Sequence, residues 1–482
     1  MNTIPNTIYN EYKAARDFKD SIGDKGIYEQ SRINERFYRG DQWYGVNTSG
    51  DKPLVRHNVI KRIADFKLSR IMSDETPIKY FVDNIAYLEN DRKNITALKD
   101  EIIKSGKAAL GEKPDNAEMN LIAKALSKNR ELCAERLGFK NLCAKALRDA
   151  YVTGTGILYT FWDQKARGGT GDIGCEVLSV NDVFFSDPHE KDIEKQKYII
   201  ITGVYDTDRV LREAKQFEKT VDEKSIIKDS VGGKVLTFTK LYKEYTKSGE
   251  EIVMCVKSTE SAVIRPPFRT FLSKYPINVF CFEERDDCVY GDSEVTYLIP
   301  NQIAINRMIT ANVWSSMSTG IPIMVVNGDS VTSEITNDPG QIIKVYGTNE
   351  DVKGAVNFIS PPDYSKDFCE NINNLIQNTL TQSGATAAVL GDEILNNATA
   401  LSYLRGSAFM SLDIIKERFL AFRKNVATIW ADFFINCYGE RPLKMKEGEN
   451  VYYIPFSSSR YDTVVLTVET ETDTETKEEE EK

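Results

Sequence analysis

Apolar residues recur in steps of three and four from about Thr399 onward, which is the spacing of one face of an α-helix. The repeating positions are Leu412, Ile415, Phe419, Phe422, Val426, Ile429 and Phe433. Ile414, Trp430 and Phe434 widen this stripe, which favours a helix packed on several neighbours over a coiled coil. Thr399 is an acceptable N-cap, and a helix of about forty residues spans about 60 Å. Gly406 predicts a kink within it.

The same spacing predicts helices in five earlier segments. They cover residues 8–39, 58–76, about 116–150, 295–318 and 363–382. In the third segment the positions expected to face inward are Leu121, Ala125, Leu132, Leu142, Ala146 and Leu147. Turn residues from Gly40 to Gly45 end the first helix, and Pro77 ends the second. Because proline disrupts a helix interior, Pro300 predicts that the fourth helix starts at or just before it.

Strand-like patterns dominate the region between residues 157 and 290. The predicted strands are 157–162, 198–204, 235–243, 252–256, 262–264 and 277–282, and 235–243 alternates with a period of two. Pro266 and Pro267 predict a loop before the last of them. Gly154-x-Gly156 stands between a helix and the first strand. A dinucleotide-binding fingerprint has the reverse order, so phosphate binding is not expected at these glycines.

Residues 290–440 combine the two patterns in a particular order. A turn at Tyr290-Gly291-Asp292-Ser293 opens a helix, and a β excursion over 321–358, a second helix and a loop of small residues over 384–397 precede the long helix. The strands expected in the excursion are 323–326 and 342–345, with a turn at Asp338-Pro339-Gly340 between them. Nothing in this order resembles an active site, and it favours a structural role.

The remaining segments complete an α+β prediction. Residues 84–115 are polar and predict a solvated helix or an insertion, and strands are expected at 451–456 and 463–468 before an acidic, disordered tail. A chain of 482 residues is expected to form two to four compact units. No apolar run approaches the ~18 residues that span a bilayer, and the N-terminus lacks the pattern of a secretion signal.

The charge of the chain is concentrated in its tail. The net charge is −10, and residues 469–482 hold eight acids against two lysines, which gives −6 there and leaves −4 for the rest. A protein that grips nucleic acid through its phosphates normally carries a basic surplus, and this chain does not. We therefore expect no extended nucleic-acid-binding surface.

Residues suited to catalysis or metal binding are sparse. The eight cysteines are scattered without a Cys-x-x-Cys pair, and only two histidines, His57 and His189, are present. This pattern argues against zinc and Cys–His sites and predicts reduced thiols, and no cofactor is expected. The chain also lacks a Walker loop and a Ser-His-Asp set.

One dense group of acids remains. Glu283, Glu284, Asp286 and Asp287 flank Arg285. The group is compatible with a divalent-metal nuclease site or with a solvated loop, and we favour the loop.

Six short motifs follow one another in the order found in a known family. They are Phe37-Tyr38-x-Gly40-x-Gln42-Trp43, Asn58-Val59-Ile60 through Pro77, Asp149-Ala150-x-x-x-Gly154-x-Gly156, Val180-x-Asp182-Val183-Phe184, Tyr290-Gly291-x-Ser293 with Gln302 and Asn306, and Asn397-Ala398-Thr399-Ala400. Together they resemble the portal proteins of tailed bacteriophages over roughly residues 8–468. Each motif is weak alone, and their shared order makes the resemblance specific.

The resemblance implies a portal fold with a wing, a two-helix stem, a small α/β clip and a crown that is minimal or absent. Its parts would be a wing over 1–292, stem helices over 293–320 and 363–383, a clip over 321–362, a tunnel loop over 384–397, a long kinked wing helix with returning strands over 398–468, and a disordered tail over 469–482. Such proteins form rings of about twelve subunits at one capsid vertex of the virion, after assembly in the host cytoplasm.

The resemblance also implies partners. They are the terminase large subunit, head–tail connector or adaptor proteins, the major capsid and scaffold proteins, and double-stranded DNA that passes through the channel without sequence specificity. No membrane and no enzymatic activity are implied. Another head-completion or minor head protein is an alternative, and a metal-dependent nuclease is a more remote one.

Two groups of residues would carry the function. The DNA channel would be lined by Gly384, Thr386, Val389, Leu390, Gly391, Asp392, Glu393 and Asn396 of the tunnel loop. The clip would dock the terminase or an adaptor through Asn327, Asp329, Asn337, Asp338 and Lys344. The loop carries acids and no lysine or arginine, which suits a channel through which DNA slides.

Overall fold

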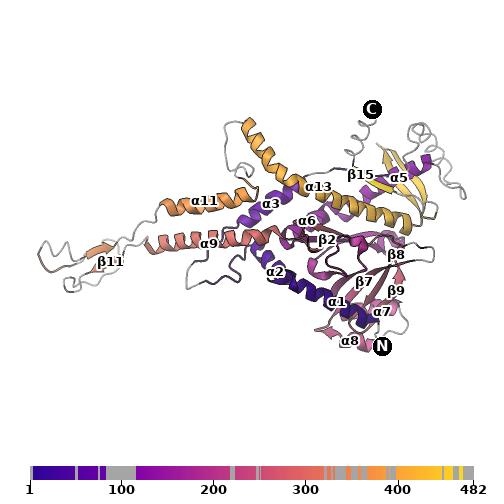
Figure 1. The fold of residues 1–482 in the computed structure, drawn as a ribbon, viewed down its shortest axis with the longest axis horizontal. Coiled ribbons are helices and arrows are strands. Elements are labelled where there is room, and N and C mark those ends of the chain that lie inside the picture. Colours follow the sequence, from indigo (N-terminus) through magenta and orange to yellow (C-terminus); the bar gives the residue numbers. More distant parts are fainter. Residues whose placement is uncertain are drawn as a thin grey trace. The chain divides into compact units, whose positions relative to one another are not determined.

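The structure of the protein is a computed structural model (Figure 1). The structure describes residues 4–48, 53–73, 76–82, 116–217, 223–245, 249, 251–319, 323–326, 329, 331, 344–348, 356–359, 366–386, 390, 398–447, 450–459 and 466–470. The chain divides into two compact units. The first contains residues 1–35, 64–297 and 409–482, and the second contains residues 36–63 and 298–408. Helices and strands are mixed, so the predicted α+β class is confirmed.

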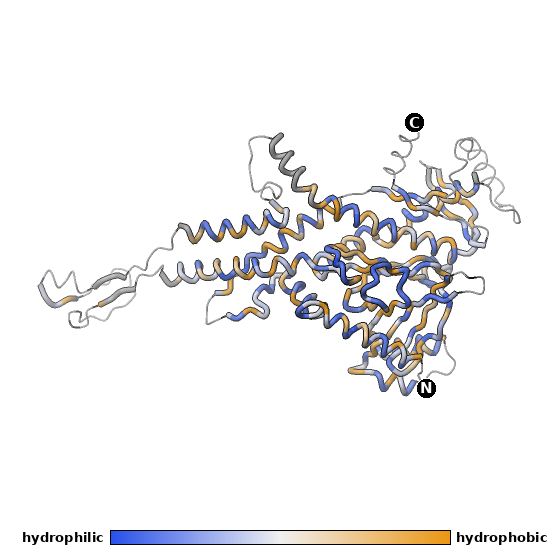
Figure 2. The backbone as a smooth tube through the Cα atoms, viewed as in Figure 1, coloured by the Kyte–Doolittle hydropathy of each residue, from blue (hydrophilic) through white to orange (hydrophobic). Residues whose placement is uncertain are grey.

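Two helices begin the chain where one was predicted. They are α1 (Ile4–Ser21) and α2 (Gly26–Arg39), and polar and apolar residues alternate along both (Figure 2). The prediction of one helix over 8–39 is wrong because the chain turns between them. Gly23 and Gly26 have φ values of 63° and 71°, and a Cβ at Gly26 would lie 2.8 Å from the carbonyl oxygen of Asp20.

A six-stranded antiparallel sheet is the centre of the first unit. Its strands are β4 (Val183–Phe185), β5 (Tyr198–Asp206), β7 (Lys234–Tyr245), β8 (Glu251–Ser258) and β9 (Val263–Arg269) in that spatial order, with β6 (Ser230–Val231) paired to β7. Helix α1 covers one face, where Ile8 and Tyr12 pack on Phe238. On the other face Val210 and Ile226 pack with Val235. The strand at 235–243 is confirmed, and its alternation serves two covered faces.

Two helices in this region were not predicted. Helix α7 (Thr207–Phe217) and helix α8 (Glu223–Lys228) supply the second cover of the sheet. Helix α7 buries only Val210 and Ala214 along its length. Its sequence therefore has fewer regularly spaced apolar residues than the strands around it, and the helix was missed. The predicted loop at Pro266 and Pro267 is also wrong. These prolines belong to β9 at the edge of the sheet, where a missing N–H costs least.

A three-stranded sheet with the order β10-β2-β3 adjoins helix α6 in the same unit. Its strands are β2 (Thr155–Asp163), β3 (Asp172–Leu178) and β10 (Ile277–Cys281). The helix predicted over 116–150 is two helices, α5 (Asn116–Leu137) and α6 (Phe139–Thr153), because Gly138 has a φ of 59°. Leu132 was expected inside and is 37% exposed, so that assignment is wrong, and the buried positions beside it in α5 include Asn129 and Cys133.

Helix α13 (Ala398–Cys437) confirms the strongest pattern in the sequence. All seven apolar positions predicted from Leu412 to Phe433 are buried, as are Trp430 and Phe434. The neighbours are several, because Phe419 and Phe422 contact Phe280 of β10 while Trp430 contacts Phe139 of α6. Ile414 was assigned to the same stripe and is 66% exposed, so that assignment is wrong.

Four further strands of the first unit form two antiparallel pairs. Strand β1 (Ile78–Val82) pairs with β15 (Leu466–Thr470), and β13 (Glu440–Glu447) pairs with β14 (Asn450–Ser457). Strand β13 was not predicted because its sequence is mostly charged and contains Pro442. The described residues after Gly439 are thus mainly strands.

A fully buried lysine fixes α1 to the sheet. The ammonium group of Lys19 donates hydrogen bonds to the carbonyls of Val180 and Val183, and it lies 3.9 Å from the ring centroid of Phe184. Burial lowers the pKa of Lys19 well below its ordinary value of 10.5, although Asp182 opposes the shift. The folded protein therefore releases this proton at a lower pH than the unfolded chain.

This difference predicts a pH dependence of stability. Between the folded-state pKa of Lys19 and 10.5 the unfolded chain binds more protons, so the free energy of unfolding should rise with pH by up to about 1.4 kcal/mol per pH unit. Buried thiols with a raised pKa, such as Cys255, oppose this rise in the native protein and in its variants alike. In urea unfolding at a series of alkaline pH values, the slope of the native protein should therefore exceed that of Lys19→Met by this amount. Lys13→Met on the exposed side of α1 is the control and should keep the native slope. An unchanged slope in Lys19→Met would contradict the assignment.

Within the described residues, the second unit includes the end of α2, parts of other helices and one strand pair. Helix α3 (Val59–Met72), helix α9 (Glu294–Thr319), helix α11 (Lys366–Gln382) and the beginning of α13 contribute, together with β11 (Ile323–Val326) and β12 (Val356–Ile359). Helix α9 begins six residues before Pro300, so the predicted start at or just before the proline is wrong. The side chain of Ser293 caps it by accepting a hydrogen bond from the N–H of Val295.

Candidate functional site

The helix–excursion–helix stretch lies in the second unit. Helices α9 and α11 lie side by side (Figure 1), and Asn312 on α9 donates a hydrogen bond to the sulfur of Cys369 on α11 at 3.7 Å. Ile305 and Asn306 on α9 are buried, as are Ile372 and Leu380 on α11. The segments predicted as 295–318 and 363–382 are therefore helices, within a few residues at each end.

The β excursion between these helices is an antiparallel pair in which Ile323 is opposite Ile359. The partner of β11 is β12 and not the strand predicted at 342–345. Of that predicted strand, Ile342 and Ile343 lie outside the described residues, and Val345 forms an isolated bridge with Val331. Of the expected docking residues, Asp329 and Lys344 are exposed. Asn327, Asn337 and Asp338 lie outside the described residues.

The expected DNA-facing loop is described only in part. Gly384 ends α11 with a φ of 77°, and its N–H donates to the carbonyl of Thr381. Thr386 is half-buried, and its carbonyl accepts from the N–H of Leu390, whose conformation is helical rather than that of a loop. The remaining predicted residues, Val389, Gly391, Asp392, Glu393 and Asn396, lie outside the described residues.

A buried polar network in the second unit holds segment 53–63 against α9. The side-chain carbonyl of Gln302 accepts hydrogen bonds from the N–H groups of Val59 and Ile60 at 2.9 and 3.3 Å, and thus caps α3 from another helix. The Gln302 amide nitrogen donates to the carbonyl of His57 at 2.6 Å. Asn58 caps α3 as well, because its side-chain oxygen accepts from the N–H of Lys61.

Asn306 extends this network one turn further along α9. Its side-chain oxygen accepts from the N–H of His57 at 2.9 Å and from Gln302 at 3.1 Å, and its nitrogen donates to Gln42 at 2.8 Å. Gln302, Asn306 and Gln42 are all at most 1% exposed. Residues of three of the sequence motifs therefore satisfy each other's hydrogen-bonding groups in the interior of one unit.

The Asp149–Gly156 motif meets the Tyr290–Ser293 turn in the first unit through glycines of both segments. A Cβ at Gly154 would lie 2.1 Å from the carbonyl oxygen of Gly291, and a Cβ at Gly291 would lie 2.7 Å from that of Gly154. A Cβ at Gly156 would lie 2.0 Å from the carbonyl oxygen of Ala146. Only glycine allows backbones to approach this closely. Gly154-x-Gly156 is thus a packing site between α6, β2 and the Tyr290–Ser293 turn, consistent with the prediction that it does not bind phosphate.

The acids at 283–287 do not converge on a common point. Arg285 contacts Asp287 and Asp292 at 2.8 and 3.2 Å, Asp286 contacts Lys191 at 3.4 Å, and Glu284 contacts Arg418 at 3.3 Å. The hydrogen bond from Arg285 lowers the pKa of Asp287 to about 2. Because these acids face different cations, they do not present a shared set of oxygen ligands, which favours the solvated-loop interpretation.

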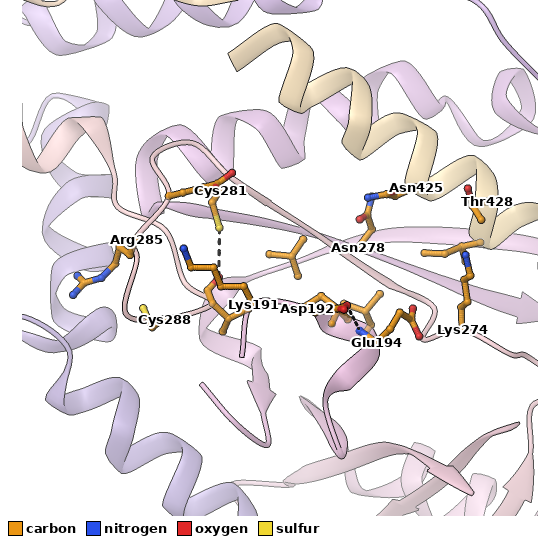
Figure 3. A pocket seen from close by; sticks show the side chains of 16 residues that line it. Lys191, Asp192, Glu194, Lys274, Asn278, Cys281, Arg285, Cys288, Asn425 and Thr428 are labelled. Atoms are coloured by element: carbon orange, nitrogen blue, oxygen red, sulfur yellow. Dashed lines mark hydrogen bonds between the residues drawn. The ribbon is translucent and has the colours of Figure 1, made fainter. Parts of the chain in front are cut away.

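A cavity lies beside this loop. It has a volume of about 450 Å³ and is formed by residues from the 191–194 segment, β10, the 284–289 loop and α13 (Figure 3). Three cations and three anions line it: Lys191, Lys274, Arg285, Asp192, Glu194 and Glu284. Some of these charged side chains form ion pairs with residues outside the cavity lining, such as Glu194 with Lys243 at 2.9 Å. Because positive and negative side chains are equal in number, the lining favours neither an anionic nor a cationic ligand.

The described part of the chain contains few groups suited to nucleophilic catalysis or metal binding. No group of three or more potential metal ligands occurs among these residues. All eight cysteines are free thiols, and burial raises the pKa of Cys255 to about 12 and that of Cys175 to about 11. Such thiols are poor nucleophiles. Among the described helices, none is both long and apolar enough to cross a membrane.

Neither family models nor curated proteins provide a match to this chain. The residues and their geometry therefore carry the functional argument. The sequence singled out the motif residues but not their partners, because Gln302 and Val59 are 243 positions apart. Asparagine and glutamine at apolar positions of a predicted helix need hydrogen-bond partners. This need is the signal that could have suggested a contact between α9 and the 57–60 segment.

Proposed function

We propose that this protein is a bacteriophage portal protein, a ring-forming structural component that conducts DNA at one vertex of the capsid. The observation that carries the proposal is the pairing of motifs. Gly154 contacts Gly291 in one unit, and Gln42 and His57–Ile60 contact Gln302 and Asn306 in the other. Motifs that are weak singly thus act in pairs as parts of one fold, which supports the resemblance that they suggest together.

The arrangement between residues 294 and 437 adds support. Helix α9, the β11–β12 pair, helix α11 and the forty-residue helix α13 follow the order of stem, clip, stem and wing helix. We assign these roles to them, and residues 384–397 to the tunnel loop. The terminase and a head–tail adaptor would dock on the clip, where Asp329 and Lys344 are exposed.

The charge of the chain suits a conduit. Every phosphate that a protein neutralises adds affinity for DNA, so a channel through which duplex DNA moves should carry few cations. Outside its tail the chain has a net charge of −4, and residues 384–397 contain Asp392 and Glu393 but no lysine or arginine. In this account the protein acts through its shape and has no enzymatic activity. The separate pairing of the acids at 283–287 counts against the nuclease alternative.

Removing the tunnel loop should separate assembly from function. We expect deletion of residues 387–396 to leave ring formation intact and to abolish DNA packaging, because the deleted segment would contact DNA and not the neighbouring subunit. DNA content per particle in an assembly system that carries this chain measures the effect. Shortening the β7–β8 loop at residues 246–250 is the control and should leave packaging unchanged. Normal packaging without residues 387–396 would refute the assignment.

A further inference from the structure

Two arginines converge on one fully buried carboxylate in the first unit. Asp172, at the start of β3, is 0% exposed. Its Oδ2 atom lies 2.6 Å from the Nε of Arg167 and 3.1 Å from an Nη of Arg136. Its Oδ1 atom accepts hydrogen bonds from the N–H of Ile173 at 2.8 Å and from the hydroxyl of Tyr438 at 3.0 Å. Oδ1 is thus hydrogen-bonded, whereas Oδ2 lies in two ion pairs and accepts no hydrogen bond within the described residues.

A third arginine joins this cluster without an acidic partner. Arg441, in β13, donates to the carbonyls of Gly171, Thr170 and Tyr438 at 3.1, 3.0 and 2.7 Å. Its guanidinium also lies 3.9 Å from the ring centroid of Tyr438. Neutral carbonyls orient this guanidinium but do not neutralise its charge.

The cluster therefore carries excess positive charge. Three guanidinium groups surround one carboxylate, which leaves two positive charges uncompensated. Glu135, Asp163 and Glu440 stand near these arginines in the sequence, and within the described residues none of the three pairs with them. Burial lowers the pKa of Arg441, while Tyr438 and Asp172 oppose the shift and Arg167 adds to it.

Part of the cluster is open to solvent. The side chains of Arg136 and Arg167 are 36% and 40% exposed, and their Nη1 atoms have no partner among the described residues. Arg167 has a φ of 48°, a conformation that costs free energy outside glycine, and its ion pair with Asp172 helps to hold it there. Gly168 and Gly169 follow, and no atom lies within 4 Å of where their Cβ atoms would stand. The backbone beside Arg167 is therefore open at these two glycines.

We propose that Arg136, Arg167 and Arg441 form a binding site for a phosphate-type oxyanion. The planar guanidinium group presents paired N–H donors that match two oxygens of a phosphate, and Arg136 and Arg167 retain free donors. The anion is either free phosphate or a phosphodiester group of nucleic acid. Asp172 positions the arginines and limits the affinity by its own charge. The site is a local cluster in the first unit and does not depend on the proposed channel.

Binding of two probes to the full-length protein tests this site. Inorganic phosphate and a short DNA duplex are titrated separately by calorimetry at low ionic strength, against the native protein and Arg167→Gln. We expect Arg167→Gln to weaken binding at least about tenfold, the usual loss for a charge-assisted hydrogen bond. Arg212→Gln on α7 removes the same charge from a distant exposed arginine and should change affinity by less than about twofold.

A second variant makes the prediction directional. Asp172→Asn keeps an acceptor for Tyr438 and removes a negative charge, so it should tighten binding where a purely structural cluster would show no gain. If Arg167→Gln fails to fold, Asp172→Asn and Arg136→Lys, which keeps the charge but loses the paired donors, provide the readout. Tighter binding by the first and weaker binding by the second support the site.

The two probes distinguish the source of the anion. Arg167-dependent binding of phosphate and DNA alike indicates a site for the free anion, and dependence with DNA alone indicates a phosphodiester group. Absence of binding of both probes at millimolar concentration would overturn the proposal. Equal losses in Arg167→Gln and Arg212→Gln would overturn it as well, since they would reflect net charge alone.

Discussion

Gly156→Ala is expected to lower the free energy of unfolding by at least about 3 kcal/mol and to leave much of the protein insoluble. The new Cβ would lie 2.0 Å from the carbonyl oxygen of Ala146, a backbone atom that cannot rotate away. To remove this steric overlap, α6 must move away from β2, which disturbs the packing of the buried residues Ala150 and Ile157. A loss of this size is a large fraction of the about 5–15 kcal/mol that stabilises a typical protein. Soluble yield and urea unfolding followed by circular dichroism measure it.

Gly406→Ala is the matched control for this substitution. Both glycines have φ values outside the left-handed region, but Gly406 lies in α13 and has no atom within 4 Å of its Cβ position. Alanine there should be neutral or stabilise the helix by up to about 1 kcal/mol. If Gly156→Ala unfolds at the same urea concentration as the native protein, the close contact between α6 and β2 does not exist.

Asn306→Leu is expected to cost about 3 kcal/mol and to release segment 53–63 from α9. The substitution removes the acceptor of the His57 N–H and the donor to the side-chain oxygen of Gln42, both in a buried site, and it removes one of the contacts of Gln302. Each buried polar group left unsatisfied costs about 1–3 kcal/mol. Hydrogen exchange read by mass spectrometry should show faster exchange in residues 53–63, while β7 in the other unit keeps its native rate.

Asn301→Leu is the control on the same helix. Asn301 is half-buried, and no hydrogen bond of its side chain occurs within the described residues. The same change of residue type should alter stability by less than about 0.5 kcal/mol. Unchanged exchange in residues 53–63 of Asn306→Leu would show that the network does not hold this segment.

The long-range order of the fold was predictable where one pattern dominates a segment. Helix α13 buries all seven predicted apolar positions, and β7 alternates between two covered faces. Breaks in helices were less predictable, because Gly138 interrupts a helical pattern that continues on both sides. Proline misled twice, once inside α9 and once in the edge strand β9. In both places the folded protein accommodates a proline at a position that the local preferences of helices and strands disfavour.

The candidate site was predictable in its residues but not in its contacts. Gln302 and Asn306 were singled out by their place in a motif, while their partners at 42 and 57–60 depend on how distant segments pack. The arginine cluster at Asp172 was not predicted, because its members come from three segments that are far apart in the sequence: α5, the β2–β3 turn and β13. A sequence with a net charge of −10 gives no hint of a local positive excess.

The central claim is that this chain assembles into a DNA-conducting ring, and the mass of the purified full-length protein tests it most directly. Light scattering together with class averages from electron microscopy should show a closed ring of about twelve copies with a central channel. A subunit mass of 54.6 kDa makes such a ring easy to separate from small oligomers. A stable monomer at every protein concentration and ionic strength would contradict the account.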